Sequence, residues 1–179
     1  LAVDRLVAVD ALIEDLWSGK PPAAAMTSLR AYVSNLRRVL EPGRASRAPA
    51  TVLHTRTPGY LLDSHGVDFD IHQFTEHASA GREALNQTDP EHAMVEFDAA
   101  LHLWRGPAYA DMRDATWAAL EVARLEELRL SVVEGRCAAA LALGDHHHAA
   151  AELDGHVRAH PLREYGCELL ALALYRAGR

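Results

Sequence analysis

A change of pattern near residue 63 constrains the fold of this chain most. Before it, two segments of helical length are followed by two short strand-like runs, at 9–17, 23–40, 51–54 and 60–62. After it, the strand-like runs disappear, and polar turns separate further segments of helical length. The sequence therefore predicts a mainly α chain, with a first domain at 1–63 that holds a short β-hairpin and an all-helical second domain at 68–179.

Composition excludes several classes of protein. Apolar residues make up 49% of the 179 residues and charged residues 24%, which is typical of an ordered globular protein. No apolar run approaches the roughly 20 residues that a membrane helix needs, and the first residues lack the pattern of an export signal. Cys137 and Cys167 have no neighbours at metal-ligand spacing. We therefore expect a cytoplasmic protein with no membrane span and no zinc site.

Charge is divided unevenly along the chain. Residues 1–63 carry eight Lys and Arg residues against six Asp and Glu residues, whereas the remainder carries ten against nineteen. The net charge of -7 therefore belongs to the second part. Such asymmetry indicates two domains with different partners, and only the first is suited to a polyanion.

The first predicted helix, Val9–Trp17, is short and amphipathic. Asp10 lies in its first turn, where the helix dipole favours a negative charge. Ser18–Pro22 ends the helix, because glycine permits a C-terminal cap and the two prolines cannot continue the hydrogen-bond ladder. The apolar stripe consists of Leu12, Ile13, Leu16 and Trp17.

The second predicted helix, 23–40, has two distinct sides. Its apolar stripe consists of Leu29, Val33, Leu36 and Leu40. The opposite side gathers hydroxyl and guanidinium donors, which suit phosphates and base edges, on Thr27, Arg30, Ser34, Arg37 and Arg38. For an isolated helix, a simple solvated polar face is the favoured explanation of such a pattern.

The segment after this helix favours the DNA-binding interpretation. The strand-like runs 51–54 and 60–62 are joined through Arg56-Thr57-Pro58-Gly59, for which we predict a type II turn with Gly59 at a positive φ. A helix, a tight break, a basic helix and an arginine-bearing hairpin follow one another in the order of a winged helix.

Six motifs carry a resemblance to a known family. They are Ala11–Trp17, Tyr32–Arg38, Thr55–Tyr60, Leu103–Pro107, Arg124–Arg129 and His160–Glu164. With them the chain resembles the actinobacterial SARP-type (Streptomyces antibiotic regulatory protein) transcriptional activators over essentially its whole length. The resemblance implies an OmpR-like winged helix followed by a bacterial transcriptional activation domain of tetratricopeptide-like helix pairs.

The resemblance also implies roles for individual residues. It makes 23–40 the recognition helix and places Arg56 at the adjacent minor groove. Arg37 and Arg38 would hold phosphates, whereas the residues nearest the major groove would be Thr27, Ser28, Arg30 and Ser34. Tyr32 has two open interpretations, core packing or a phosphate hydrogen bond. The implied partners are double-stranded DNA at promoter direct repeats and RNA polymerase, and a homodimer is an arrangement that the resemblance allows.

The chain departs from the family pattern in a few places. Many relatives carry arginine where Asn35 stands and a hydroxyl residue where Ala8 stands. The family's winged helix begins with a small antiparallel sheet and a first helix, which nothing before Val3 supplies. We therefore expect a DNA-binding domain that is incomplete at its N-terminus, a helical domain incomplete at its C-terminus, and an exposed apolar side on the first helix.

The second domain is predicted to contain five helices in pairs. The segments of helical length are 72–87, 90–104, 116–143, 146–159 and 162–177. Asp89-Pro90 is a good start signal, and Gly144-Asp145 a good stop signal. Consecutive helices of this kind stack by burying each other's apolar sides.

The sequence gives only weak signals for catalytic or metal-binding sites. Three consecutive histidines, His146–His148, spread over about 200° of a helix, so a polar helix start is favoured over a metal site. Glu126 and Glu127 point apart and do not form an acid/base pair. No phosphate loop or nucleophile motif is present. We expect no enzymatic activity, no metal and no cofactor.

Two alternatives stay open at this point. Trp104, Arg105 and Arg163 either line a ligand groove or pack and cap the helices, and packing is favoured. The acidic second domain also suits a protein-binding scaffold, such as the regulatory segment of a larger signalling ATPase, in which the N-terminal segment only packs.

Overall fold

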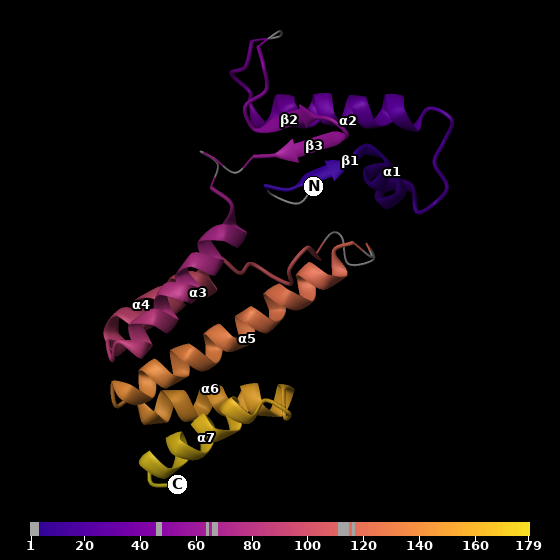
Figure 1. Ribbon diagram of the computed structural model, residues 1–179. Coiled ribbons are helices and arrows are strands. Elements are labelled where there is room, and N and C mark those ends of the chain that lie inside the picture. The colour runs from indigo at the N-terminus through magenta and orange to yellow at the C-terminus, as the bar shows by residue number, and fades with distance from the viewer. Residues whose placement is uncertain (1–3, 46–47, 64, 66–67, 111–114, 116) are drawn as a thin grey trace. The chain divides into compact units, whose positions relative to one another are not determined.

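The computed structural model describes residues 4–45, 48–63, 65, 68–110, 115 and 117–179 (Figure 1). The chain divides into two compact units. The first unit comprises residues 1–69 with 115–117, and the second comprises 70–114 with 118–179. No helix within the described ranges is long and apolar enough to cross a membrane.

A three-stranded antiparallel sheet lies in the first unit. Its strands are β1 (Leu6–Ala8), β2 (Leu53–Arg56) and β3 (Gly59–Leu62), in the order β1-β3-β2. In the register, Ala8 and Arg56 both pair with Gly59, one from each side. The hairpin was predicted, whereas β1 was not, because three residues are too few to show the alternation of a strand.

The hairpin turn differs from the prediction. The Thr57–Pro58 peptide bond is cis, and Gly59 does not have a positive φ, so the predicted type II turn is wrong. Gly59 is required for a different reason. A Cβ atom added at Gly59 would lie 1.8 Å from the backbone oxygen of Val7, so only glycine allows β1 to approach β3 this closely.

Two helices complete the first unit. Helix α1 (Val9–Trp17) has the predicted bounds, and α2 (Ala25–Leu40) begins two residues later than predicted. Ser18, in the left-handed conformation with φ 48°, ends α1 by donating its backbone N–H to the Glu14 oxygen over 2.7 Å.

The core of the first unit is small. Its main cluster within the described residues has four buried side chains, and half-buried residues of α1 and the strand ends pack around them: Leu29, Val33, Leu53 and Tyr60, then Val9, Leu12, Ile13 and Leu62. The predicted apolar stripes are only partly buried, since Leu16, Leu36 and Leu40 are exposed. A strand of 4 residues extends over about 13 Å, which is too short to cover a helix of 16 residues.

The second unit is all helical, as predicted. Its helices are α3 (Asp70–Asn86), α4 (Pro90–His102), α5 (Ala119–Ala142), α6 (His146–Ala159) and α7 (Glu164–Arg176). Each helix packs against the next one along the chain (Figure 1). The predicted starts of α4 and α6 are exact, because Asp89 and Asp145 accept the backbone N–H of His92 and His148, respectively.

Aromatic packing against glycine joins the first three helices of this unit. Phe97 of α4 is buried, and Cβ atoms added at Gly81 of α3 or Gly135 of α5 would lie within 2.7 Å of its ring. The side chain of Trp104 meets Phe74 edge to face, with ring centroids 5.3 Å apart, and carries the Arg129 guanidinium over its ring. Trp104 therefore packs, as favoured from the sequence.

A buried ion pair joins the last three helices. Arg163, just before α7, donates from Nε and Nη2 to the two Glu134 carboxylate oxygens over 2.7 and 2.8 Å, and His156 of α6 lies 3.0 Å from the same carboxylate. Burial alone would raise the pKa of Glu134, but the hydrogen bonds from Arg163 and His156 hold it below its ordinary value. Arg163 therefore has a structural role in this unit.

Candidate nucleic-acid interface

One face of α2 presents hydroxyl and guanidinium groups to solvent. Thr27, Arg30, Ser34 and Arg38 are all exposed, and their spacing of three or four residues places them in one row along the helix. Leu29 and Val33, on the opposite side, are buried against the sheet. The core therefore fixes which side of α2 faces outward, and the sequence predicted this side correctly for these four residues.

Arg37 lies at the edge of that face and contacts the sheet. Its Nε donates to the Leu53 backbone oxygen over 2.8 Å, and its Nη2 donates to the Thr55 hydroxyl over 2.8 Å. The sequence placed Arg37 among the outward phosphate contacts. The structure gives Arg37 two bonds to β2, which join α2 to the hairpin.

Two further polar residues modify the exposed face. Arg38 donates to the Asn35 side-chain oxygen over 3.3 Å, so Asn35 positions a guanidinium that the sequence assigned to a phosphate. Ser28 is half-buried near the start of α2, unlike its neighbour Thr27. Ser28 is therefore less accessible than the other residues predicted for the major groove.

Arg56 is exposed at the end of β2, directly before the hairpin turn. Figure 1 shows the hairpin alongside α2, and the contacts of Arg37 join the two elements. A basic helix and an arginine on a hairpin therefore belong to one compact unit, an arrangement that suits recognition through two adjacent grooves.

Sequence reasoning missed Glu41, which ends α2. One of its carboxylate oxygens accepts hydrogen bonds from the Thr51 hydroxyl and the backbone N–H groups of Thr51 and Val52, at 2.5 to 2.8 Å. Its other oxygen pairs with Arg44 at 3.0 Å. These contacts, led by the Thr51 hydroxyl, lower the pKa of Glu41 to about 2. The Glu41 carboxylate therefore holds the end of α2 against the residues that lead into β2.

The surroundings of Tyr32 do not distinguish core packing from a phosphate hydrogen bond. Its ring stacks on Trp17 of α1, with centroids 6.4 Å apart and an angle of 23° between the planes, yet half of the side chain stays exposed. Leu16, Leu36 and Val39 are exposed as well. This part of the first unit is therefore apolar and lies apart from the row of polar groups on α2.

One group of side chains has the composition of a metal site. Asp4, Asp63 and His65 offer ligand atoms within 4.8 Å of one another. Ion pairing explains the closest contact, because the His65 ring nitrogen lies 2.7 Å from an Asp63 oxygen and the pKa of His65 is raised by that bond. The group is largely exposed, and we assign it no ligand.

Comparison with known proteins identifies the family. Residues 69–179 match the family described as the bacterial transcriptional activator domain. The chain belongs to the SARP family of transcriptional regulators. The resemblance seen in the six sequence motifs is therefore confirmed.

Relatives of this SARP-family chain align with both of its units. The regulatory protein DnrI of Streptomyces peucetius is 37% identical over 182 residues, which cover 100% of this chain and 67% of DnrI. The transcriptional regulator RedD of Streptomyces coelicolor is 34% identical and is covered over 51% of its length. EmbR of Mycobacterium tuberculosis is 35% identical and is covered over 45%. The chain thus spans about half to two thirds of these regulators.

A solved structure confirms the fold of the SARP-family chain. The structure of Mycobacterium tuberculosis EmbR, in complex with a low-affinity phosphopeptide, superposes with a TM-score of 0.89 at 34% identity. The match covers 99% of this chain and 46% of EmbR. The predicted fold class, mainly α with a short hairpin and a helical second domain, is confirmed, and the described residues hold seven helices and a three-stranded sheet.

Proposed function

We propose that this SARP-family regulator binds double-stranded promoter DNA through the exposed face of α2. Thr27, Arg30 and Ser34 lie toward base edges in the major groove, with Ser28 at the margin, and Arg38 holds a phosphate. Arg56 on the hairpin reaches the adjacent minor groove. The observation that carries the proposal is the row of exposed donors on α2, whose opposite side is fixed in a hydrophobic core.

Arg37 has a combined role in this proposal. Its bonds to Leu53 and Thr55 hold α2 and the hairpin at a fixed spacing, so the two elements meet the duplex together. A phosphate contact from the outer part of the same guanidinium is compatible with these bonds, because the group has five N–H donors. Loss of Arg37 therefore weakens binding to all sequences.

The second unit acts as the activation domain in the proposal. It is acidic, whereas the first part of the chain is slightly basic, so it does not compete with α2 for the duplex. The protein works in the cytoplasm, binds direct repeats in promoters and recruits RNA polymerase through this unit. A homodimer on two adjacent repeats fits the same scheme.

The test compares single-arginine variants in a DNA titration. A duplex selected from genomic fragments and a random duplex of equal length are titrated at several salt concentrations. Arg30→Ala is expected to cost about 1 to 3 kcal/mol on the selected duplex and much less on the random one. Arg38→Ala is expected to weaken both alike and to reduce the slope of affinity against salt.

The control variant is Arg158→Ala. Arg158 of α6 is exposed and paired with Asp154, so its loss removes a cation from the protein without changing α2. This variant is expected to bind like the native protein. Equal losses on both duplexes for Arg30→Ala would contradict the base-reading role of Arg30.

A further inference from the structure

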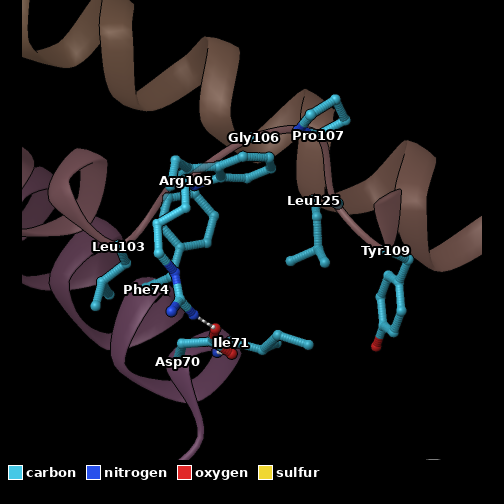
Figure 2. A pocket seen from close by; sticks show the side chains of 11 residues that line it. Asp70, Ile71, Phe74, Leu103, Arg105, Gly106, Pro107, Tyr109 and Leu125 are labelled. Carbon is cyan, nitrogen blue, oxygen red and sulfur yellow. Dashed lines mark hydrogen bonds and ion pairs between the residues drawn. The ribbon is translucent and has the colours of Figure 1, made fainter. Parts of the chain in front are cut away.

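A cavity of about 280 Å³ lies in the second unit (Figure 2). It is formed where three segments meet: the start of α3, the irregular segment 103–109 and the first half of α5. Its volume is close to the lower end of the range for small-molecule sites, roughly 300 to 1,000 Å³. The cavity therefore suits a compact ligand, smaller than a typical drug.

The walls of the cavity are mainly apolar and are held in place by packing. Ile71, Phe74 and Leu125 line it, and the last two are buried in the core of the unit. Trp104 also lines it, fixed between Phe74 and the Arg129 guanidinium. These walls exist before any ligand arrives, which lowers the entropic cost of binding.

The polar end of the cavity carries a matched pair of charges. Arg105 donates to the Asp70 carboxylate over 3.3 Å, as the dashed line in Figure 2 shows. The other Asp70 oxygen accepts the backbone N–H of Ile71 at 2.9 Å. Since the two charges compensate each other, this end offers a donor and an acceptor but no net charge.

Tyr109 closes the side opposite Arg105. In Figure 2 the open space lies between the Tyr109 ring and the Arg105 side chain, with Leu125 and Ile71 on the other two sides. Tyr109 has a φ of 49°, which is rare for a bulky residue and typical of functional segments. Burial raises the pKa of its hydroxyl, so this side of the cavity is also uncharged at neutral pH.

We propose that this cavity binds a small, uncharged, ring-containing molecule that carries a hydroxyl or carbonyl group. The rings lie between Tyr109 and the apolar walls, where aromatic side chains favour a flat partner. The polar group meets Asp70 and Arg105. A charged ligand is disfavoured, because the described residues that line the cavity include no unpaired charge to compensate its loss of hydration. This inference does not depend on DNA binding.

The experiment titrates the full chain with 2-naphthol, which is uncharged at neutral pH. Binding is followed by NMR through the backbone signals of 103–109 and the indole N–H of Trp104. Saturable shifts confined to the lining residues are expected, and naphthalene-2-sulfonate, which has the same rings and a negative charge, is expected to bind at least about tenfold more weakly.

Two variants separate the cavity from nonspecific adsorption. Arg105→Ala removes an exposed donor at the polar end, so the fold is retained, and affinity for 2-naphthol is expected to fall about fivefold or more. Ile71→Trp fills the cavity and is expected to abolish the shifts. The matched control, Arg158→Ala, removes an exposed, ion-paired arginine elsewhere in the unit and is expected to bind normally.

Three results would overturn the proposal. The first is an absence of saturable shifts at the lining residues. The second is equal affinity of the Arg105→Ala variant and the Arg158→Ala control. The third is equal affinity for 2-naphthol and naphthalene-2-sulfonate, which would contradict the preference for an uncharged ligand.

Discussion

Arg37 of α2 donates its Nε proton to the backbone oxygen of Leu53 in β2, at 2.8 Å. A second bond from the same guanidinium reaches the Thr55 hydroxyl. The sequence pattern grouped Arg37 with Arg30 and Arg38 on the outer face of the helix, whereas the structure shows that it joins this helix to the hairpin. Among the residues that the structure describes, its neighbour Arg38 bonds only to Asn35, within α2.

This difference predicts unequal effects on stability. Arg37→Ala is expected to lower the unfolding free energy of the first unit by about 1 to 2 kcal/mol, because it removes two hydrogen bonds from a charged donor. Arg38→Ala is expected to change it by less than about 0.5 kcal/mol. Urea unfolding followed by the NMR signals of residues 4–62 measures both. Equal stabilities of the two variants would contradict the role given to Arg37.

We predict that position 59 tolerates no residue larger than glycine. In Gly59→Ala the new Cβ would lie 1.8 Å from the Val7 oxygen, so β1 must separate from β3. We expect a loss of about 3 kcal/mol or more, together with faster hydrogen exchange in β1. Gly43→Ala is the matched control, because a Cβ atom there meets no described atom within 4 Å. Unchanged exchange in β1 would show that the strand does not pair as described.

The lowered pKa of Glu41 predicts that the stability of the protein depends on pH. Its pKa is about 2 in the folded protein, against an ordinary value of 4.5. Because the folded value is the lower one, the stability contributed by Glu41 is fully present above about pH 4.5 and is lost as the pH falls toward 2.

The measurement compares the native protein with Glu41→Gln by thermal unfolding across this pH range. The variant is expected to be less stable at neutral pH, and the difference is expected to shrink steadily below pH 4.5. A difference that is constant with pH would mean that the charge of Glu41 contributes nothing.

The buried pair of Glu134 and Arg163 predicts the largest effect in the second unit. Glu134 is 3% exposed, so Arg163→Ala leaves a buried carboxylate without its guanidinium partner. A loss of about 3 to 5 kcal/mol is expected. The exposed pair at Arg158 serves as a control, for which less than about 1 kcal/mol is expected. Denaturant unfolding followed by circular dichroism at 222 nm, a wavelength used for helices, distinguishes the two.

The sequence predicted the helices well because their signals are local. Apolar periodicity, proline at the start of α4 and aspartate caps before α4 and α6 act within a few residues. The same periodicity predicted which side of α2 is buried at Leu29 and Val33, and which side carries Arg30 and Ser34.

The sequence did not predict features that depend on distant residues. Strand β1 exists because Gly59 lets Val7 and Ala8 approach, and Arg37 turns toward β2 because the Leu53 carbonyl and the Thr55 hydroxyl lie there. In both cases the residues that determine the structure lie far along the sequence from the residue that they affect. Leu36 and Leu40 continue the apolar stripe of α2 but are exposed, because periodicity does not report how far the covering sheet extends.

The most direct test of the central claim is an NMR study of the protein bound to a duplex selected from genomic fragments. Intermolecular nuclear Overhauser effects report which side chains lie against the DNA. We predict contacts from Thr27, Arg30 and Ser34 to base protons of the major groove, and from Arg56 to sugar protons of the minor groove. Contacts confined to the second unit, or a complex in which these four side chains show none, would contradict the proposed interface.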